Sequence, residues 1–211
     1  MGLQIVSAKQ TTDLSKHGVT VCVYSQSGLG KTTLVSTLPK SYWKNILIAE
    51  FEEGGVMRAL HGLDIPFIQF SMQKDMIEAL KAWNEFLKEF PDKPPYDKMG
   101  VKWLFINSWS ELQKFLEFGL QYARGKKFIT LKEYGDAANK GREYLRLLKA
   151  LNRKGINVMI EAHEDTYEVE IEGTGAKRSM LFPKVGRTFA KEFLHVIDFC
   201  GHMELRTVGD V

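Results

Sequence analysis

A glycine-rich segment between an apolar run and a helix-forming run carries the clearest chemistry in the sequence. It directly follows the β-branched run VTVCVY and reads Ser25-Gln26-Ser27-Gly28-Leu29-Gly30-Lys31-Thr32-Thr33. Gly28 and Gly30 allow the backbone to turn so that consecutive N–H groups point inward, and the following helix adds its positive N-terminal end. Lys31 can reach β- and γ-phosphates, and Thr32 offers a hydroxyl to Mg²⁺. All nine residues are therefore predicted to form a phosphate-binding loop (P-loop) for ATP with Mg²⁺.

The first position of this loop departs from the usual pattern. G-x-x-x-x-G-K-[ST] is met except at Ser25, which stands in place of glycine. We therefore expect Ser25 to accept the turn conformation with a side chain present, with a slight loss of affinity. The alternative is a chance turn between strand and helix, and the strand before it and the helix after it argue against that.

An acidic cluster follows the next strand-like run. A P-loop ATPase needs one carboxylate near Mg²⁺ and a group that activates the attacking water. The run NILIAEFEEGG places Glu50, Glu52 and Glu53 where a strand gives way to a Gly-Gly turn. We expect Glu52 to be the catalytic, water-activating carboxylate, with Glu53 as second choice. The alternative is a solvated acidic turn.

A second strand end, in KWLFINSWSEL, has the apolar run that precedes a Walker B acid, but Asn107 occupies the position of the aspartate. An amide oxygen can accept a hydrogen bond from a Mg²⁺-bound water but brings no negative charge. We therefore place Asn107 with Thr32 at the metal site and expect either slow hydrolysis or a residue altered to trap nucleotide. Replacing Asn107 by Asp is expected to raise hydrolysis about tenfold.

His163 follows the strand-like run INVMIEA. At a third strand end that faces the same crevice, its imidazole is predicted to sense the γ-phosphate and to act in catalysis with Lys31 and Glu52. A lone histidine is more often an ordinary surface or hydrogen-bonded residue, and that alternative stays open. The remaining histidines form no metal-ligand spacing.

The hydrophobic pattern predicts the elements that position these residues. Apolar runs at 18–24, 45–50, 65–70, 103–107 and 156–162 read as strands, and helical patterns cover 31–38, 72–90, 110–123 and 141–155. The alternation predicts an α/β fold, a three-layer P-loop NTPase with a mostly parallel central sheet. Ligands then bind beyond the carboxyl ends of the strands. The proline-rich stretch 90–100 is predicted to be a surface loop without helix.

Composition places limits on the partners. A chain of 211 residues with a net charge of +3 fits one domain over 1–211 and is too weakly basic to bind nucleic acid through bulk charge. Cys22 and Cys200 lie in apolar runs, which favours buried free thiols and a reducing, cytoplasmic compartment over a disulfide. No run is long enough to span a membrane, and no signal peptide is recognisable.

Taken together, these motifs resemble those of phage RecA-like P-loop ATPases. The chain is similar, from about Val19 to Met203, to a short phage family of AAA-type nucleotide-binding proteins that includes single-strand annealing proteins with a minimal RecA core. Besides the P-loop, Glu52 and Asn107-Ser108, the resemblance rests on the string Tyr134-Gly135-Asp136 at the start of a long helix and on VMIEAHE.

The resemblance implies a RecA-like core, ATP and Mg²⁺ as cofactors, and single-stranded DNA as partner. It also implies a homo-oligomeric ring or filament with nucleotide between subunits, and phage single-strand-binding or replication proteins as further partners in the host cytoplasm. By position, Lys31 and Thr32 hold phosphate and Mg²⁺, Glu52 is the catalytic acid and His163 is the sensor. Asn107 replaces the Asp of the family.

Two basic loops are candidates for contact with DNA, 124–128 and 173–178, although each can equally be an ordinary solvated loop. Lys184 or Arg187 could instead reach the γ-phosphate of a neighbouring subunit. The alternative function is a nucleotide-dependent switch or loader ATPase that works through protein partners.

Overall fold

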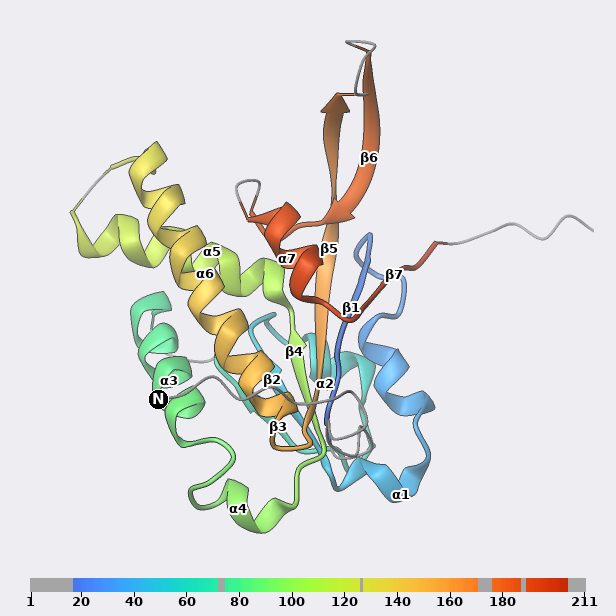
Figure 1. Ribbon diagram of the computed structural model, residues 1–211. Helices are drawn as coiled ribbons and strands as arrows, with labels where there is room; N and C mark the ends of the chain where they lie inside the picture. The colour runs from blue at the N-terminus through green and yellow to red at the C-terminus, as the bar shows by residue number, and fades with distance from the viewer. Residues whose placement is uncertain (1–16, 72–74, 126, 171–175, 187–188, 205–211) are drawn as a thin grey trace, which may run out of the picture.

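The fold is built on one central sheet (Figure 1). The structure is a computed structural model that describes residues 17–71, 75–125, 127–170, 176–186 and 189–204. The strands lie in the order β3-β2-β4-β5-β1-β7, with β6 paired to β5. Their bounds are β1 (Thr20–Ser25), β2 (Ile46–Glu50), β3 (Phe67–Gln69), β4 (Trp103–Asn107), β5 (Asn157–Glu170), β6 (Lys177–Pro183) and β7 (Phe199–His202). Every pairing except β5 with β6 is parallel, which confirms the predicted mostly parallel sheet.

Helices cover both faces of this sheet, which confirms the three-layer arrangement (Figure 1). The layer that contains the large aromatic core is formed by α3 (Met76–Glu89), α4 (Tyr96–Met99), α5 (Trp109–Ala123), α6 (Leu131–Asn152) and α7 (Ala190–Val196). The opposite layer is formed by the 3-10 helix η2 (Thr32–Thr37), α1 (Lys40–Trp43) and α2 (Gly55–Ala59).

The apolar strands serve both layers at once. In β2, Leu47 and Ala49 belong to the core that contains Trp83, whereas Ile46 and Ile48 belong to the opposite core. Successive side chains of a strand point to opposite faces, so a strand covered on both faces must be apolar throughout. This burial explains why the central strands are continuous apolar runs in the sequence.

The helices differ from the prediction in several places: α1, α2 and α7 lie outside the predicted helical ranges, and two further segments differ in their helical content. The helix predicted over 141–155 begins at Leu131, because Thr130 and Glu133 form a capping box at its start. Segment 90–100 was predicted to lack helix and is wrong in that respect: it contains α4, which begins directly after Pro95. A proline limits the helix that precedes it but is well suited to a helix start.

The expectation of two buried thiols is confirmed for Cys22 and wrong for Cys200. Both cysteines are free, and they are direct neighbours in the pairing of β1 with β7. Cys200 is exposed because β7 is an edge strand. Across the described residues, no helix has the length and apolar character needed to cross a membrane.

Candidate nucleotide-binding site

The P-loop follows β1 directly, as predicted, but Ser25 lies in the strand rather than in the turn. Ser25 is the last residue of β1, is fully buried, and remains paired with His163 of β5. The turn falls on Gly28 and Gly30, whose φ angles are 83° and 86°. The prediction that Ser25 adopts the turn conformation is therefore wrong, because the glycine-dependent conformations occur later in the loop.

Lys31 is folded back against the loop. Its Nζ donates hydrogen bonds to the carbonyl oxygens of Ser25 (3.2 Å) and Gln26 (2.9 Å) and to Ser25 Oγ (3.1 Å). Burial lowers the pKa of Lys31 from 10.5, and the nearby carboxylates of Glu161 and Glu52 act in the opposite direction. The N–H groups of the ammonium thus already point at acceptors of the loop. Negatively charged phosphate oxygens would be stronger acceptors than these carbonyl oxygens.

A cleft of about 410 Å³ opens at the carboxyl ends of the strands. Of the predicted residues, its lining includes Ser27, Gly28, Gly30, Lys31, Thr32, Thr33, Glu52 and His163. Ser25, Gln26 and Leu29 do not line the cleft. Ser25 and Gln26 instead accept hydrogen bonds from the Lys31 ammonium group. Sequence reasoning missed four lining residues, namely Gly55, Arg58 and Ala59 of α2 and Glu161 of β5. Arg58 adds an exposed cation to this lining.

The Thr32 hydroxyl lies between two buried side chains from neighbouring strands. It donates a hydrogen bond to Glu161 Oε2 (2.9 Å) and accepts one from Asn107 Nδ2 (3.2 Å). The predicted placement of Asn107 beside Thr32 agrees with this contact. Glu161 was missed, although a single charged residue in the apolar run INVMIEA, two positions before His163, could have indicated a shared strand face.

The surroundings of Glu161 disfavour the charged form of its carboxyl group. Burial raises the pKa of its carboxyl group from 4.5 to about 7, while the hydrogen bond from Thr32 and the charge of Lys31 act in the opposite direction. Its second oxygen, Oε1, has no hydrogen-bond partner among the described residues. A buried carboxylate with an unpaired oxygen destabilises the nucleotide-free fold.

Glu161→Gln is therefore expected to stabilise the protein in the absence of nucleotide and Mg²⁺. The pKa of Glu161 is higher in the folded state than the unfolded value of 4.5, so the parent protein loses stability as pH rises from 4.5 to about 7. Above that window the advantage of the variant reaches about 3 kcal/mol, since one pKa unit corresponds to about 1.4 kcal/mol.

Urea unfolding of both proteins at several pH values between 4 and 8 measures this difference. A constant gap between the two unfolding free energies across the range would contradict the buried, ionisable state of Glu161.

The three glutamates at the end of β2 and in the turn that follows have different environments. Glu50 is fully buried, and its two oxygens accept hydrogen bonds from the Val56 amide (2.7 Å) and from Gln69 Nε2 (3.1 Å). Glu52 lines the nucleotide cleft, whereas Glu53 is exposed and lines a different cleft beside α3. Glu50 thus fixes the start of α2, and of the three only Glu52 faces the P-loop.

His163 lies within β5 rather than after it, because the strand continues beyond the sheet. Its main-chain N–H donates to Ser110 Oγ (2.9 Å), and its carbonyl accepts from the Lys184 amide (2.7 Å). The imidazole is half-buried in the cleft lining, with Nε2 4.0 Å from Glu111 Oε1. Burial, followed by the charge of Lys31, lowers the pKa of His163, so the ring is neutral at pH 7. A neutral imidazole can still donate one hydrogen bond to a phosphate oxygen.

The two predicted basic loops differ in how their cations are placed. In 124–128, Arg124 forms ion pairs with Glu133 and Asp136 and so holds the start of α6. The strands that flank the second loop, β5 and β6, pair antiparallel as a hairpin, and 171–175 lie outside the described residues. Lys177 and Arg178 are exposed at the outer end of this hairpin, and Lys184 is exposed at its base. Arg187 lies outside the described residues.

Comparisons with known proteins agree with this geometry. A search of curated proteins found no match. A family model described as AAA domain matches residues 17–210, a span that includes the P-loop, Asn107, Glu161 and His163. The chain therefore belongs to this AAA domain family and is a nucleotide-binding domain of the P-loop ATPase type.

Proposed function

We propose that this protein binds ATP with Mg²⁺, hydrolyses it slowly, and acts on single-stranded DNA in phage-type recombination or strand annealing. The observation that carries the nucleotide part is the arrangement of Lys31 and Thr32 at one cleft with Glu52 and His163. Lys31 supplies a cation for the phosphates and Thr32 a hydroxyl for the metal. Glu52 supplies a carboxylate, and His163 a hydrogen-bond donor to the γ-phosphate.

The residues present fit Mg²⁺. Two buried side-chain oxygens near Thr32, Asn107 Oδ1 and Glu161 Oε1, have no hydrogen-bond partner among the described residues. Oxygen atoms of this kind are the ligands and water acceptors that Mg²⁺ prefers. Bound Mg²⁺ would neutralise charge on the transferred phosphoryl group. Thr32 would hold the ion, and Glu52 would orient and deprotonate the attacking water.

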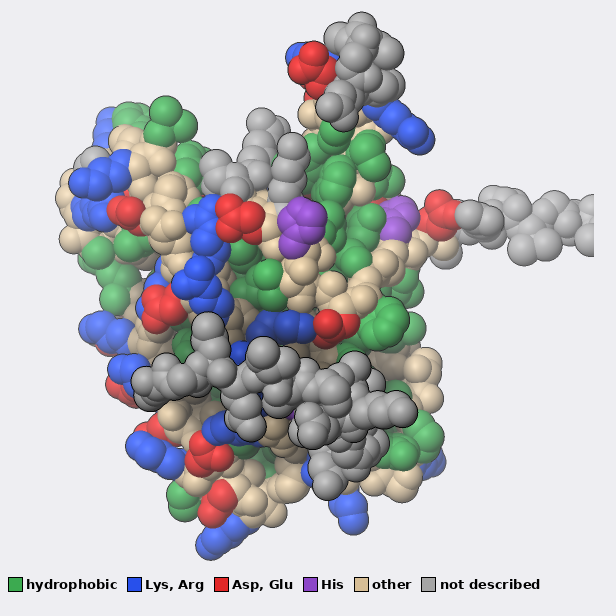
Figure 2. Space-filling model, viewed as in Figure 1, with side chains coloured by type: hydrophobic (Ala, Val, Ile, Leu, Met, Phe, Trp, Pro, Cys, Tyr) green, Lys and Arg blue, Asp and Glu red, His purple; other side chains and the backbone are tan. Residues whose placement is uncertain are grey.

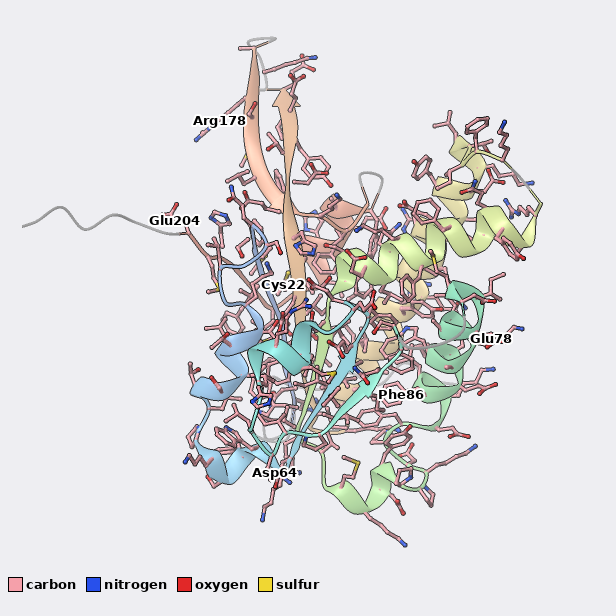
Figure 3. All side chains as sticks on the ribbon, turned by 180° about the vertical axis from the view of Figure 1, so that it is seen from behind. Cys22, Asp64, Glu78, Phe86, Arg178 and Glu204 are labelled. Atoms are coloured by element: carbon pink, nitrogen blue, oxygen red, sulfur yellow. The ribbon has the colours of Figure 1, made fainter. Side chains whose placement is uncertain are left out.

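The DNA part of the proposal is supported by the hairpin formed by β5 and β6. It extends beyond the carboxyl ends of the parallel strands (Figure 1), and Glu161 and His163 of β5 line the nucleotide cleft before the strand enters the hairpin. Arg178 lies towards its outer end and points away from it (Figure 3). Exposed cations on such an arm can contact phosphates along a single strand.

We expect the parent protein to bind a labelled single-stranded oligonucleotide at low salt more tightly with ATP than without it. The double variant Lys177→Gln with Arg178→Gln should weaken this binding about tenfold and flatten its salt dependence. Fluorescence anisotropy measures both quantities. The matched control is Lys93→Gln with Lys98→Gln, which removes the same charge near α4, at the opposite end of the molecule.

A nucleotide-dependent switch or loader that works through proteins is the second candidate. It is favoured by one observation: Met180 and Leu181 expose about 40% of their surface on the same hairpin (39% and 43%), and hydrophobic side chains are visible along it in Figure 2. Exposed apolar side chains on a projecting element suit a protein contact. Absence of ATP-dependent DNA binding would reject the recombination function in favour of this one.

The proposal includes self-assembly into a ring or filament. Lys184 is exposed, its amide donates to the His163 carbonyl, and it is the cation that we expect to reach the nucleotide of a neighbouring subunit. Light scattering on the samples used for anisotropy measures the mass, which should exceed that of the monomer when ATP and DNA are both present.

A further inference from the structure

The carboxylate that contacts the P-loop threonine comes from an unexpected strand. In the pattern described above, an aspartate at the end of the apolar run that forms β4 supports the metal, but this chain has Asn107 there. Glu161, on the adjacent strand β5, accepts the hydrogen bond from the Thr32 hydroxyl. We infer that Glu161 supplies the negative charge of the Mg²⁺ site, a charge that the β4 position lacks. The carboxylate near the metal then comes from β5 instead of the adjacent strand β4.

The sheet geometry makes this exchange possible. β5 lies between β1 and β4, and its pairing with β4 ends at Ile106 opposite Ile160. Asn107 and Glu161 are the next residue on each strand, so they occupy the same row across the sheet. Neighbouring strands are about 4.8 Å apart, and a glutamate is longer than an aspartate by one methylene group. A carboxylate can therefore reach the same hydroxyl from either strand.

The hydrogen bonds of the Thr32 hydroxyl leave one lone pair of its oxygen available to a cation. A hydroxyl group has one proton and two lone pairs. The proton is donated to Glu161, and one lone pair accepts the Asn107 amide proton. The second lone pair remains for a metal ion. Asn107 in this arrangement orients the hydroxyl, while Glu161 provides the charge.

The unpaired atom of Glu161 points to the same role. Glu161 is 1% exposed, and its Oε1 has no hydrogen-bond partner among the described residues. By contrast, both carboxylate oxygens of Glu50, on β2, are satisfied by protein groups. A buried oxygen of this kind gains a partner when a metal-bound water or the ion itself arrives.

This inference changes what is expected of Asn107→Asp. From the sequence alone, that substitution adds the missing charge and raises hydrolysis. In the structure it places a second carboxylate beside the one already on Thr32, and like charges at this separation oppose each other. The tenfold gain no longer follows for the single variant, and the informative variant exchanges the two residues.

The inference rests on the proposed ATP and Mg²⁺ binding, and calorimetry of ATP binding tests it. ATP affinity is measured with Mg²⁺ and with EDTA, and the ratio of the two gives the contribution of the metal. Glu161→Gln should reduce this ratio at least tenfold, the range expected when a group that supports a metal is lost. Affinity in EDTA should be unchanged or higher, because a negative charge near the phosphates has been removed.

The exchange variant, Asn107→Asp with Glu161→Gln, should recover the Mg²⁺-dependent ratio to within about threefold of the parent protein. Glu53→Gln is the control: it makes the same chemical change at an exposed carboxylate that lines a different cleft, and it should leave the ratio unchanged. Circular dichroism and thermal unfolding establish that each variant is folded. Because the exchange variant must regain a property that Glu161→Gln loses, a general structural defect cannot produce the expected result.

Two outcomes overturn the inference. Glu161→Gln could retain the parent ratio, or the exchange variant could remain as impaired as Glu161→Gln. Failure of the parent protein to bind ATP in the presence of Mg²⁺ would instead reject the proposed function, so the two failures are distinguishable.

Discussion

Lys31→Ala is expected to reduce ATP affinity by at least about 30-fold. The side chain is buried at the base of the cleft, where its three hydrogen bonds to Ser25 and Gln26 hold the ammonium group among the loop residues. Loss of one partner of a buried, hydrogen-bonded charge pair costs about 2 to 5 kcal/mol, which corresponds to roughly 30-fold to several thousand-fold in affinity. Calorimetry with ATP and Mg²⁺ measures the difference.

Lys44→Ala provides the control, because Lys44 is an exposed cation just after α1 and outside the cleft lining. It should bind ATP as the parent protein does. Equal affinity of the Lys31 variant and the parent would mean that the cleft does not hold the phosphates through Lys31.

Glu52→Gln is expected to lower ATP hydrolysis by at least about 100-fold while ATP binding changes little. A side chain that removes a proton from the attacking water contributes about 10²- to 10⁴-fold, and an amide cannot take up that proton. Glu52 is the glutamate of its turn that lines the cleft with Lys31 and Thr32. Steady-state phosphate release measures hydrolysis, and the calorimetric assay measures binding.

Glu53→Gln is the matched control, with the same chemical change one residue later. Its side chain is exposed and lines a different cleft, so hydrolysis should remain at the parent rate. If the Glu53 variant loses hydrolysis and the Glu52 variant keeps it, the assignment of the water-activating carboxylate is wrong.

Much of the fold was predictable because the apolar runs of the sequence coincide with the strands that are buried in the structure. The strands that end at Glu50 and Asn107 are fully apolar runs covered by helices on both faces, and such runs are easily recognised. The P-loop was predictable for a different reason: its glycines, Lys31 and Thr32 must occur in fixed order directly after a strand. The hydrophobic pattern did not indicate the start of α6, which only the resemblance placed near Tyr134, because the capping box at Thr130 and Glu133 precedes a polar first turn without a strong apolar stripe.

The site was less predictable wherever it depends on which strands are neighbours. Sequence order does not state that β5 lies between β1 and β4, and only that order brings Glu161 to Thr32. Arg58 is similar, since its position in the cleft follows from how α2 returns towards the P-loop. Ser25 differs again, because the extent of strand pairing, and not the loop pattern, places it in β1.

The length of β5 has a mechanical consequence. One uninterrupted strand carries Glu161 and His163 in the cleft and then continues to Glu170 in the hairpin. The seven residue-to-residue steps from His163 to Glu170 extend roughly 23 Å at about 3.3 Å per step, so a tilt of about 5° at the base would displace the far end by about 2 Å. A small tilt of the strand at the nucleotide cleft would therefore produce a larger displacement at the outer end of the hairpin.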